Sequence, residues 1–320
     1  MLDIALLGCG GSMPIPNRFL TSLLIKYKGR KILIDCGEGT QVSMKILKWG
    51  FKSIDIICIT HRHGDHILGL PGLLSTIGNS GRTKPITIIG PRGIEAIIKG
   101  LKLAVPNIPF QVEIIEDPKG LLGVKVSSEG MKVKKTIHEE SYNDDFVIST
   151  LELDHSVPCI GYSFYIPRRP KFHIDKAISN EVPKELWKKL QSGEVVIYEG
   201  KSFEPKMVLG KERKGIKLSY IMDTRPIDTI SGFIRNSDLF ICEGTYGDDE
   251  DLEKAIKNKH MIFREAAQLA YEGDVDELLI THFSPAMDEP ELYIENAKKI
   301  FYNTNIGHDR LIKSISFKDE

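Results

Sequence analysis

The sequence lacks any run of 18 or more consecutive apolar residues, the length that a membrane-spanning helix requires, so we expect no membrane partner. Its five cysteines form no paired-cysteine motif, and this odd number argues against a disulfide framework. Reduced thiols are typical of the cytosol, so the expected location is cytoplasmic. The chain also lacks an excess of either charge, because 43 basic and 44 acidic residues give a net charge of -1. A uniformly basic surface is therefore excluded, and any contact with nucleic acid must come from a local patch.

Short apolar stretches bounded by glycine, proline and polar residues predict β-strands along most of the chain. The expected strands cover residues 3–7, 22–27, 31–35, 55–59, 85–89, 111–115, 123–126, 146–153, 217–222, 239–243 and 277–281. Helical stretches lie between several of them. A β-rich half, an interruption and a second half of strands and helices predict two packed sheets with helices outside. The expected fold is an α/β protein, a four-layered αββα sandwich, in a single domain over residues 1–320.

The interruption spans about residues 167–215 and differs in composition from its surroundings. It holds 12 lysines and arginines against seven acidic residues, together with four prolines. This composition predicts a basic arm or lid inserted into the domain. A solvated surface segment without any partner is the alternative, because runs of charge are often only exposed.

Three histidines and one aspartate stand within six residues, directly after an expected strand: His61, His63, Asp65 and His66. Imidazole nitrogens and carboxylate oxygens are ligands of Zn²⁺, and alternate residues of an extended backbone point to the same side. His61 and His63 are therefore expected to share one ion, and Asp65 and His66 a second. A loop that binds nothing is the alternative, and the spacing argues against it.

Four ligands cannot complete two ions, so the hypothesis requires further donors downstream. Such donors follow three other expected strands: His155, Asp223 and His282. Each is a weak signal alone, because a single histidine after a strand is more often structural. Together they give one assignment, in which His61, His63 and His155 bind the first ion, Asp65, His66 and His282 bind the second, and Asp223 bridges the two.

The spacing His61-x-His63-x-Asp65-His66 resembles the signature of the metallo-β-lactamase superfamily. Within it, the chain resembles the ribonuclease Z family over nearly its whole length. The matching blocks are Leu7–Pro14 with Arg18, Leu33–Gln41, Asp154–Pro158, Asp223–Pro226 and Thr281–Ser284. The resemblance implies the metallo-β-lactamase fold, two zinc ions per chain, cleavage of the 3′ extension of transfer-RNA precursors, and a homodimer. Manganese or iron would also suit these ligands.

The chain departs from the usual pattern of the resembled family at three places. Cys242 stands where family members begin His-Glu-Ala-Thr, although Glu243 and Thr245 are kept. His260-Met261-Ile262 stands in place of the usual His-Ser-Thr. The arm of the bacterial family holds a Gly-Pro-rich stretch, and the comparable residues 181–187 lack glycine, so they give no support for a grip on the transfer-RNA elbow.

The expected chemistry is an in-line displacement at phosphorus, in which two ions share a water, lower its pKa and bind the attacking and leaving oxygens. Asp65 would be both a ligand and the base that takes the remaining proton of a bridging hydroxide. The resemblance places His260 beside the scissile phosphate as the donor to the leaving 3′ oxygen, with Glu243 orienting it and raising its pKa. A histidine that merely precedes a helix is the alternative. Arg18 and Arg225 would either contact phosphates or form structural ion pairs.

Two other functions are compatible with the sequence. One keeps the metal site but hydrolyses small phosphodiesters or esters, with residues 167–215 as a lid or dimer contact. The other is a metal-free RNA-binding scaffold descended from an enzyme, and the complete set of seven ligands argues against it. Salt dependence separates RNA from small substrates, because RNA binding through several cationic side chains weakens steeply with salt.

Overall fold

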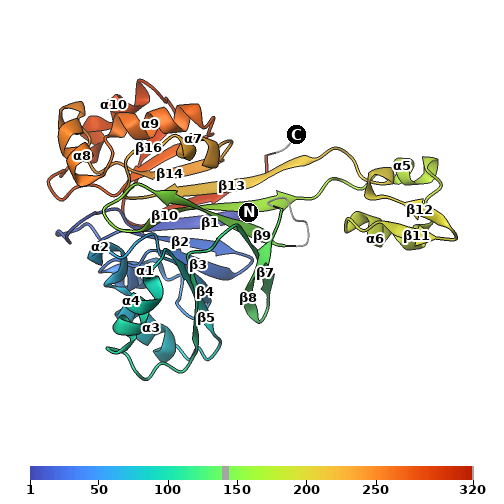
Figure 1. The fold of residues 1–320 in the computed structure, drawn as a ribbon, viewed down its shortest axis with the longest axis horizontal. Helices are drawn as coiled ribbons and strands as arrows, with labels where there is room; N and C mark the ends of the chain where they lie inside the picture. Colours follow the sequence, from blue (N-terminus) through green and yellow to red (C-terminus); the bar gives the residue numbers. More distant parts are fainter. Residues whose placement is uncertain (139–143, 319–320) are drawn as a thin grey trace.

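The computed structural model describes residues 1–138 and 144–318, and these form two β-sheets packed face to face with helices on both outer faces (Figure 1). This arrangement confirms the predicted αββα sandwich. All eleven expected strands are present, with ends displaced by four residues at most. Among the described residues, no helix combines the length and the apolar character needed to cross a bilayer.

The first sheet has seven strands in the order β17-β1-β2-β3-β4-β5-β6, and strands β3 to β6 are parallel. Its strands are β1 (Leu2–Gly8), β2 (Ser22–Tyr27), β3 (Arg30–Ile34), β4 (Ile54–Cys58), β5 (Ile86–Gly90), β6 (Val112–Glu116) and β17 (Leu311–Ile315). The helices that follow these strands cover its outer face: α1 (Thr40–Leu47), α2 (Gly64–Ile67), α3 (Leu70–Asn79) and α4 (Ile94–Lys102).

The second sheet has eight strands in the order β16-β15-β14-β13-β10-β9-β7-β8, and strands β13 to β16 are parallel. Its strands are β7 (Leu121–Ser127), β8 (Gly130–Thr136), β9 (Phe146–Leu153), β10 (Cys159–Arg168), β13 (Arg213–Ile221), β14 (Leu239–Glu243), β15 (Leu278–Thr281) and β16 (Thr304–Ile306). The outer helices are α7 (Thr229–Phe233), α8 (Leu252–Asn258), α9 (Phe263–Glu272) and α10 (Ile294–Lys298).

The alternation of side chains along β1 explains how one strand serves two layers. Leu2, Ile4 and Leu6 belong to the apolar cluster that contains the second sheet, whereas Ala5 and Leu7 belong to the cluster under the first set of helices. Successive residues of a strand point to opposite faces, so an apolar run is buried on both sides. The central strands therefore carry apolar residues on both faces.

An arm separates from the body at the far ends of β10 and β13, and Figure 1 shows it reaching well away from both sheets. It contains α5 (Ile174–Ser179), α6 (Trp187–Gln191), β11 (Val196–Tyr198) and β12 (Lys201–Phe203). Six buried side chains form an apolar cluster of its own: Ala177, Val182, Leu186, Leu190, Phe203 and Val208. The arm is thus a small folded unit with its own apolar core.

Candidate metal centre

The strand ends bring the candidate ligands together at one edge of the sandwich. β4, β9, β13 and β15 each run into a candidate ligand within a few residues. Parallel strands end at the same edge of a sheet, which is where sites in such folds form. Asp223 and His282 have left-handed backbone conformations, with φ of 45° and 62°. A non-glycine residue rarely adopts this conformation, and here it turns the side chain away from the strand direction and into the shared pocket.

The first predicted set lies together: His61, His63, His155 and Asp223 present ligand atoms that all lie within 4.8 Å of one another. The Nδ1 of His63 is 3.0 Å from Nε2 of His61 and 3.1 Å from Nε2 of His155. Oδ2 of Asp223 is 3.5 Å from Nε2 of His61. Burial is the largest cause that lowers the pKa of all three histidines, so their imidazoles are neutral and carry the lone pairs that a cation needs.

The second predicted set is equally compact and contains Asp65, His66, Asp223 and His282, all buried. Nε2 of His66 is 3.2 Å from Nε2 of His282, and Oδ1 of Asp223 is 3.0 Å from the same His282 atom. Burial alone would raise the pKa of both aspartates, but the neighbouring imidazoles hold both pKa values well below the usual range. Both carboxylates are therefore ionised, and Asp223 belongs to both sets.

Asp223 also provides the test of whether the residues fit a pair of cations. Its Oδ1 is buried and, although Nε2 of His282 lies 3.0 Å away, it accepts no hydrogen bond of good geometry within the described residues. An ionised oxygen left unsatisfied in the interior is costly, and a bound cation removes that cost. Each set offers imidazole nitrogens and carboxylate oxygen, the mixture that suits Zn²⁺. The residues present therefore fit two divalent cations joined by one shared carboxylate.

A second layer of contacts orients the ligand rings. Nδ1 of His66 lies 2.9 Å from Oδ2 of Asp35, and the backbone N–H of Thr60 donates to the other oxygen of Asp35 at 2.8 Å. Nδ1 of His155 lies 3.2 Å from the carbonyl oxygen of Lys259. Such contacts fix the tautomer and leave Nε2 facing the pocket. No role was predicted for Asp35 from the sequence, although it follows an apolar strand just as Asp223 does.

Beside the two sets, His260 contacts Glu243, as the resemblance implies. Nδ1 of His260 is 3.1 Å from Oε1 of Glu243 and 3.1 Å from the hydroxyl of Thr245. Burial would lower the pKa of His260, but the charge and hydrogen bond of the fully buried Glu243 outweigh it and raise that pKa to about 9. Cations bound at the neighbouring ligand sets would lower the pKa of His260 again, because a nearby positive charge disfavours the protonated ring.

The two arginines bind protein groups rather than the pocket. Arg18 donates to the carbonyl oxygens of Met287 and Asp288, each at 2.8 Å. Arg225 forms an ion pair with Glu265 and donates to the carbonyl oxygen of His260 at 2.5 Å. Arg225 thus forms a structural ion pair, one of its two alternatives, whereas Arg18 contacts backbone carbonyl oxygens.

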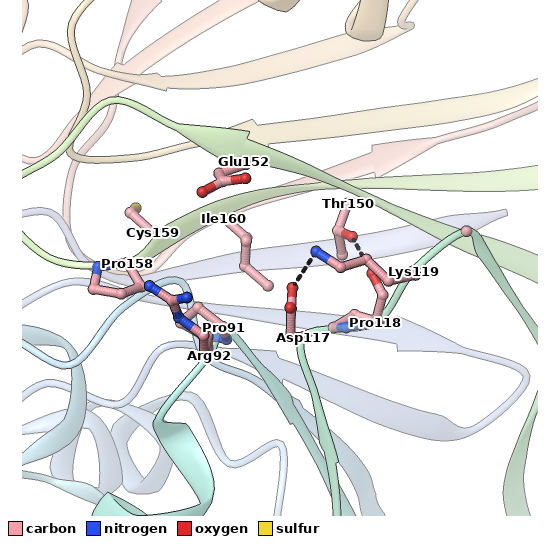
Figure 2. A pocket seen from close by; sticks show the side chains of 11 residues that line it. Pro91, Arg92, Asp117, Pro118, Lys119, Thr150, Glu152, Pro158, Cys159 and Ile160 are labelled. Atoms are coloured by element: carbon pink, nitrogen blue, oxygen red, sulfur yellow. Dashed lines mark hydrogen bonds and ion pairs between the residues drawn. The ribbon is translucent and has the colours of Figure 1, made fainter.

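A pocket of about 310 Å³ opens beside the centre at the start of β10, where the N–H of Ile160 donates to the carbonyl oxygen of Thr60 (Figure 2). Figure 2 shows Arg92 and Glu152 on one side of it and the ion pair of Lys119 with Asp117 on the other. It offers hydrogen-bond donors and acceptors next to the loop that carries His155. This pairing of charges suits a polar group of a substrate rather than an apolar one.

Full-length relatives and solved structures resemble this chain. The ribonuclease Z of Alkaliphilus oremlandii is 58% identical over 319 residues and covers 100% of both chains. That of Clostridium novyi is 55% identical over 99% of this chain and 100% of its own. The short form of human tRNase Z has a TM-score of 0.65 at 24% identity, over 98% of this chain and 100% of its own. The metallo-β-lactamase fold protein YhfI from Bacillus subtilis has a TM-score of 0.66 at 18% identity, over 98% of both. A family model described as anti-Pycsar protein Apyc1 matches residues 2–106.

Proposed function

The chain belongs to the ribonuclease Z family, and on that premise we propose that it is a metal-dependent endoribonuclease that removes the 3′ extension of transfer-RNA precursors. The observation that carries the proposal is the convergence of seven ligands from distant segments, in a chain 58% identical over its full length to a ribonuclease Z.

We propose two zinc ions per chain. His61, His63 and His155 would hold one, Asp65, His66 and His282 the other, and Asp223 both. When bound, such ions supply a water of lowered pKa and neutralise charge on the phosphate oxygens. Mixed nitrogen and oxygen ligands favour zinc, and manganese or iron are the alternatives that metal analysis would detect.

Asp65 and His260 would move the protons. The backbone N–H of Ser12 donates to Oδ2 of Asp65 at 2.6 Å, which fixes this ionised carboxylate as an acceptor for a proton of the attacking water. His260 would donate to the leaving 3′ oxygen. Glu243 and Thr245 both contact Nδ1 of His260, so the remaining ring nitrogen is the one available for the substrate. Glu243 thus positions the donor and maintains its charge.

The cytoplasm is the proposed location, because all five cysteines are free and buried. The proposed quaternary state is a homodimer. Its support is that α1 exposes Val42 and Ile46, one helical turn apart, at 49% and 55% of their surface. The basic arm is proposed to contact the RNA backbone, since its lysines and arginines outnumber its acidic residues.

The test incubates purified protein with a transfer-RNA precursor carrying a 3′ extension and with a small phosphodiester, each with and without chelator. We expect site-specific cleavage of the precursor that chelator abolishes and that 200 mM salt weakens strongly, roughly in proportion to the phosphates contacted. Asp223→Ala should lose both activity and metal, whereas His138→Ala, at an exposed position outside both ligand sets, should lose neither. Cleavage of the small phosphodiester alone, insensitive to salt, would replace the proposal with a small-molecule hydrolase.

A further inference from the structure

A basic hollow lies at the edge of the first sheet opposite to the metal centre. It has a volume of about 760 Å³ and is formed where β3 and β4 begin and where the turn after α3 passes. Five cationic side chains line it, and no carboxylate does: Arg30, Lys31, Lys52, Arg82 and Lys84. β4 separates this edge from the metal ligands by roughly 20 Å, at about 3.3 Å per residue. The hollow is therefore a separate site.

Lys31 is the least expected of these cations, because only 5% of its surface is exposed. Its ammonium donates to the hydroxyl of Ser53, and no carboxylate in the described part of the chain pairs with it. Lys26 stands directly opposite on β2, and like charges facing each other across two strands are destabilising. Burial first, and then Lys26 and Arg30, lower the pKa of Lys31 to about 8. A buried cation next to other cations is stabilised when an anion binds beside it.

The carboxylates near the hollow do not balance its charge. Asp55 alone serves both guanidiniums, since Arg30 and Arg82 each bind it. Lys84 pairs with Glu129, whose side chain is 75% exposed. Lys31 and Lys52 remain without an acidic partner among the described residues. Five cations facing two carboxylates leave a surplus of three positive charges around one hollow.

We propose that the basic hollow binds a small polyanion with two adjacent phosphates, the group that a nucleoside diphosphate carries. A charge surplus of three exceeds what a single phosphate neutralises. The volume is that of a small-molecule site, and a guanidinium fork matches phosphate oxygens. An extended RNA strand would follow a track of exposed cations, whereas two of these five cations, Lys31 and Arg82, are only 5% and 2% exposed.

Trp49 borders the hollow and provides the measurement. The chain has two tryptophans, so Trp187→Phe in the arm leaves Trp49 as the single fluorescent reporter. In this background, ADP and inorganic pyrophosphate are titrated into the metal-loaded enzyme at fixed ionic strength. Saturable fluorescence changes are expected with both. Lys52→Gln should weaken binding about tenfold or more, since it removes a charge-assisted contact. Lys299→Gln, at an exposed position just after α10, is the matched control and should leave the affinity for ADP and pyrophosphate unchanged.

Lys31→Met should also lose binding while keeping or raising the melting temperature, because it removes a buried cation facing Lys26. If that variant melts much earlier, the exposed Lys52→Gln decides the question alone. Asp223→Ala should retain ADP affinity, so this inference and the proposed function can fail separately. Binding unchanged by Lys52→Gln, or seen only with a hexaribonucleotide and with neither ADP nor pyrophosphate, would overturn the inference.

Discussion

Replacing Arg225 by methionine tests whether this arginine acts through His260. Nη1 of Arg225 donates to the carbonyl oxygen of His260 at 2.5 Å and to Oε2 of Glu265 at 2.9 Å, and Nη2 binds Oε1 of Glu265. Glu265 in turn accepts from the N–H of Ile262 at 3.1 Å. The ion pair therefore holds the segment that carries the proposed proton donor at two points. Arg225 binds the carbonyl oxygen of His260, and Glu265 binds the N–H of Ile262 just before α9.

The size of the expected loss of kcat follows from these contacts. Hydrogen bonds to charged groups contribute about 1.5–3 kcal/mol, and partial exposure of both side chains, 17% and 19%, reduces this to roughly 1–2 kcal/mol. If that free energy is lost from positioning His260, kcat should fall about 5- to 30-fold while KM for the precursor stays the same. Arg225→Lys should recover little, because an ammonium cannot bind a carboxylate in fork geometry.

A double-mutant cycle with His260→Ala identifies the path. If Arg225 acts through His260, then Arg225→Met should have almost no further effect on kcat in the His260→Ala background. Steady-state cleavage of a precursor with a 3′ extension, with metal content measured for each variant, provides the data. An equal loss of kcat in both backgrounds would refute the reasoning. A raised KM with unchanged kcat would instead indicate that Arg225 contacts an RNA phosphate.

Three further outcomes follow from the site and the core. His260→Ala should keep the bound metal and lower turnover by about 10²-fold or more, and unchanged turnover would remove it from the mechanism. In Asp35→Asn, the single amide oxygen cannot accept from both His66 and the backbone N–H of Thr60. Metal affinity, measured by chelator competition, should therefore fall roughly 10- to 100-fold. Tyr162→Phe removes a fully buried hydroxyl whose oxygen lies 2.8 Å from the carbonyl oxygen of Ile59 and 3.0 Å from that of Ile89; the free energy of unfolding in urea should fall about 1–3 kcal/mol, with kcat unchanged.

Eleven strands dominated by apolar residues were predicted, whereas β8 and β10, in which polar residues, glycine or proline interrupt the apolar pattern, were not. β10 was missed because Gly161, Ser163 and Pro167 interrupt its apolar pattern, yet it pairs with β9 and β13 along most of its length. β8 was missed because lysines alternate with its buried Met131. β8 pairs with the neighbouring strand β7, and β10 pairs with the neighbouring β9 and the distant β13; these ladders of hydrogen bonds outweigh weak local preference.

The sequence alone predicted a set of seven candidate metal ligands, because four of them lie within six residues and the others follow apolar strands, and the structure brings all seven together. It also predicted an inserted segment over about residues 167–215. Only the tertiary structure decided that Asp35 orients His66, that Arg225 holds the His260 segment, and that cations from three separate segments gather in the basic hollow. These relations join residues tens of positions apart through side-chain geometry, which no local spacing encodes.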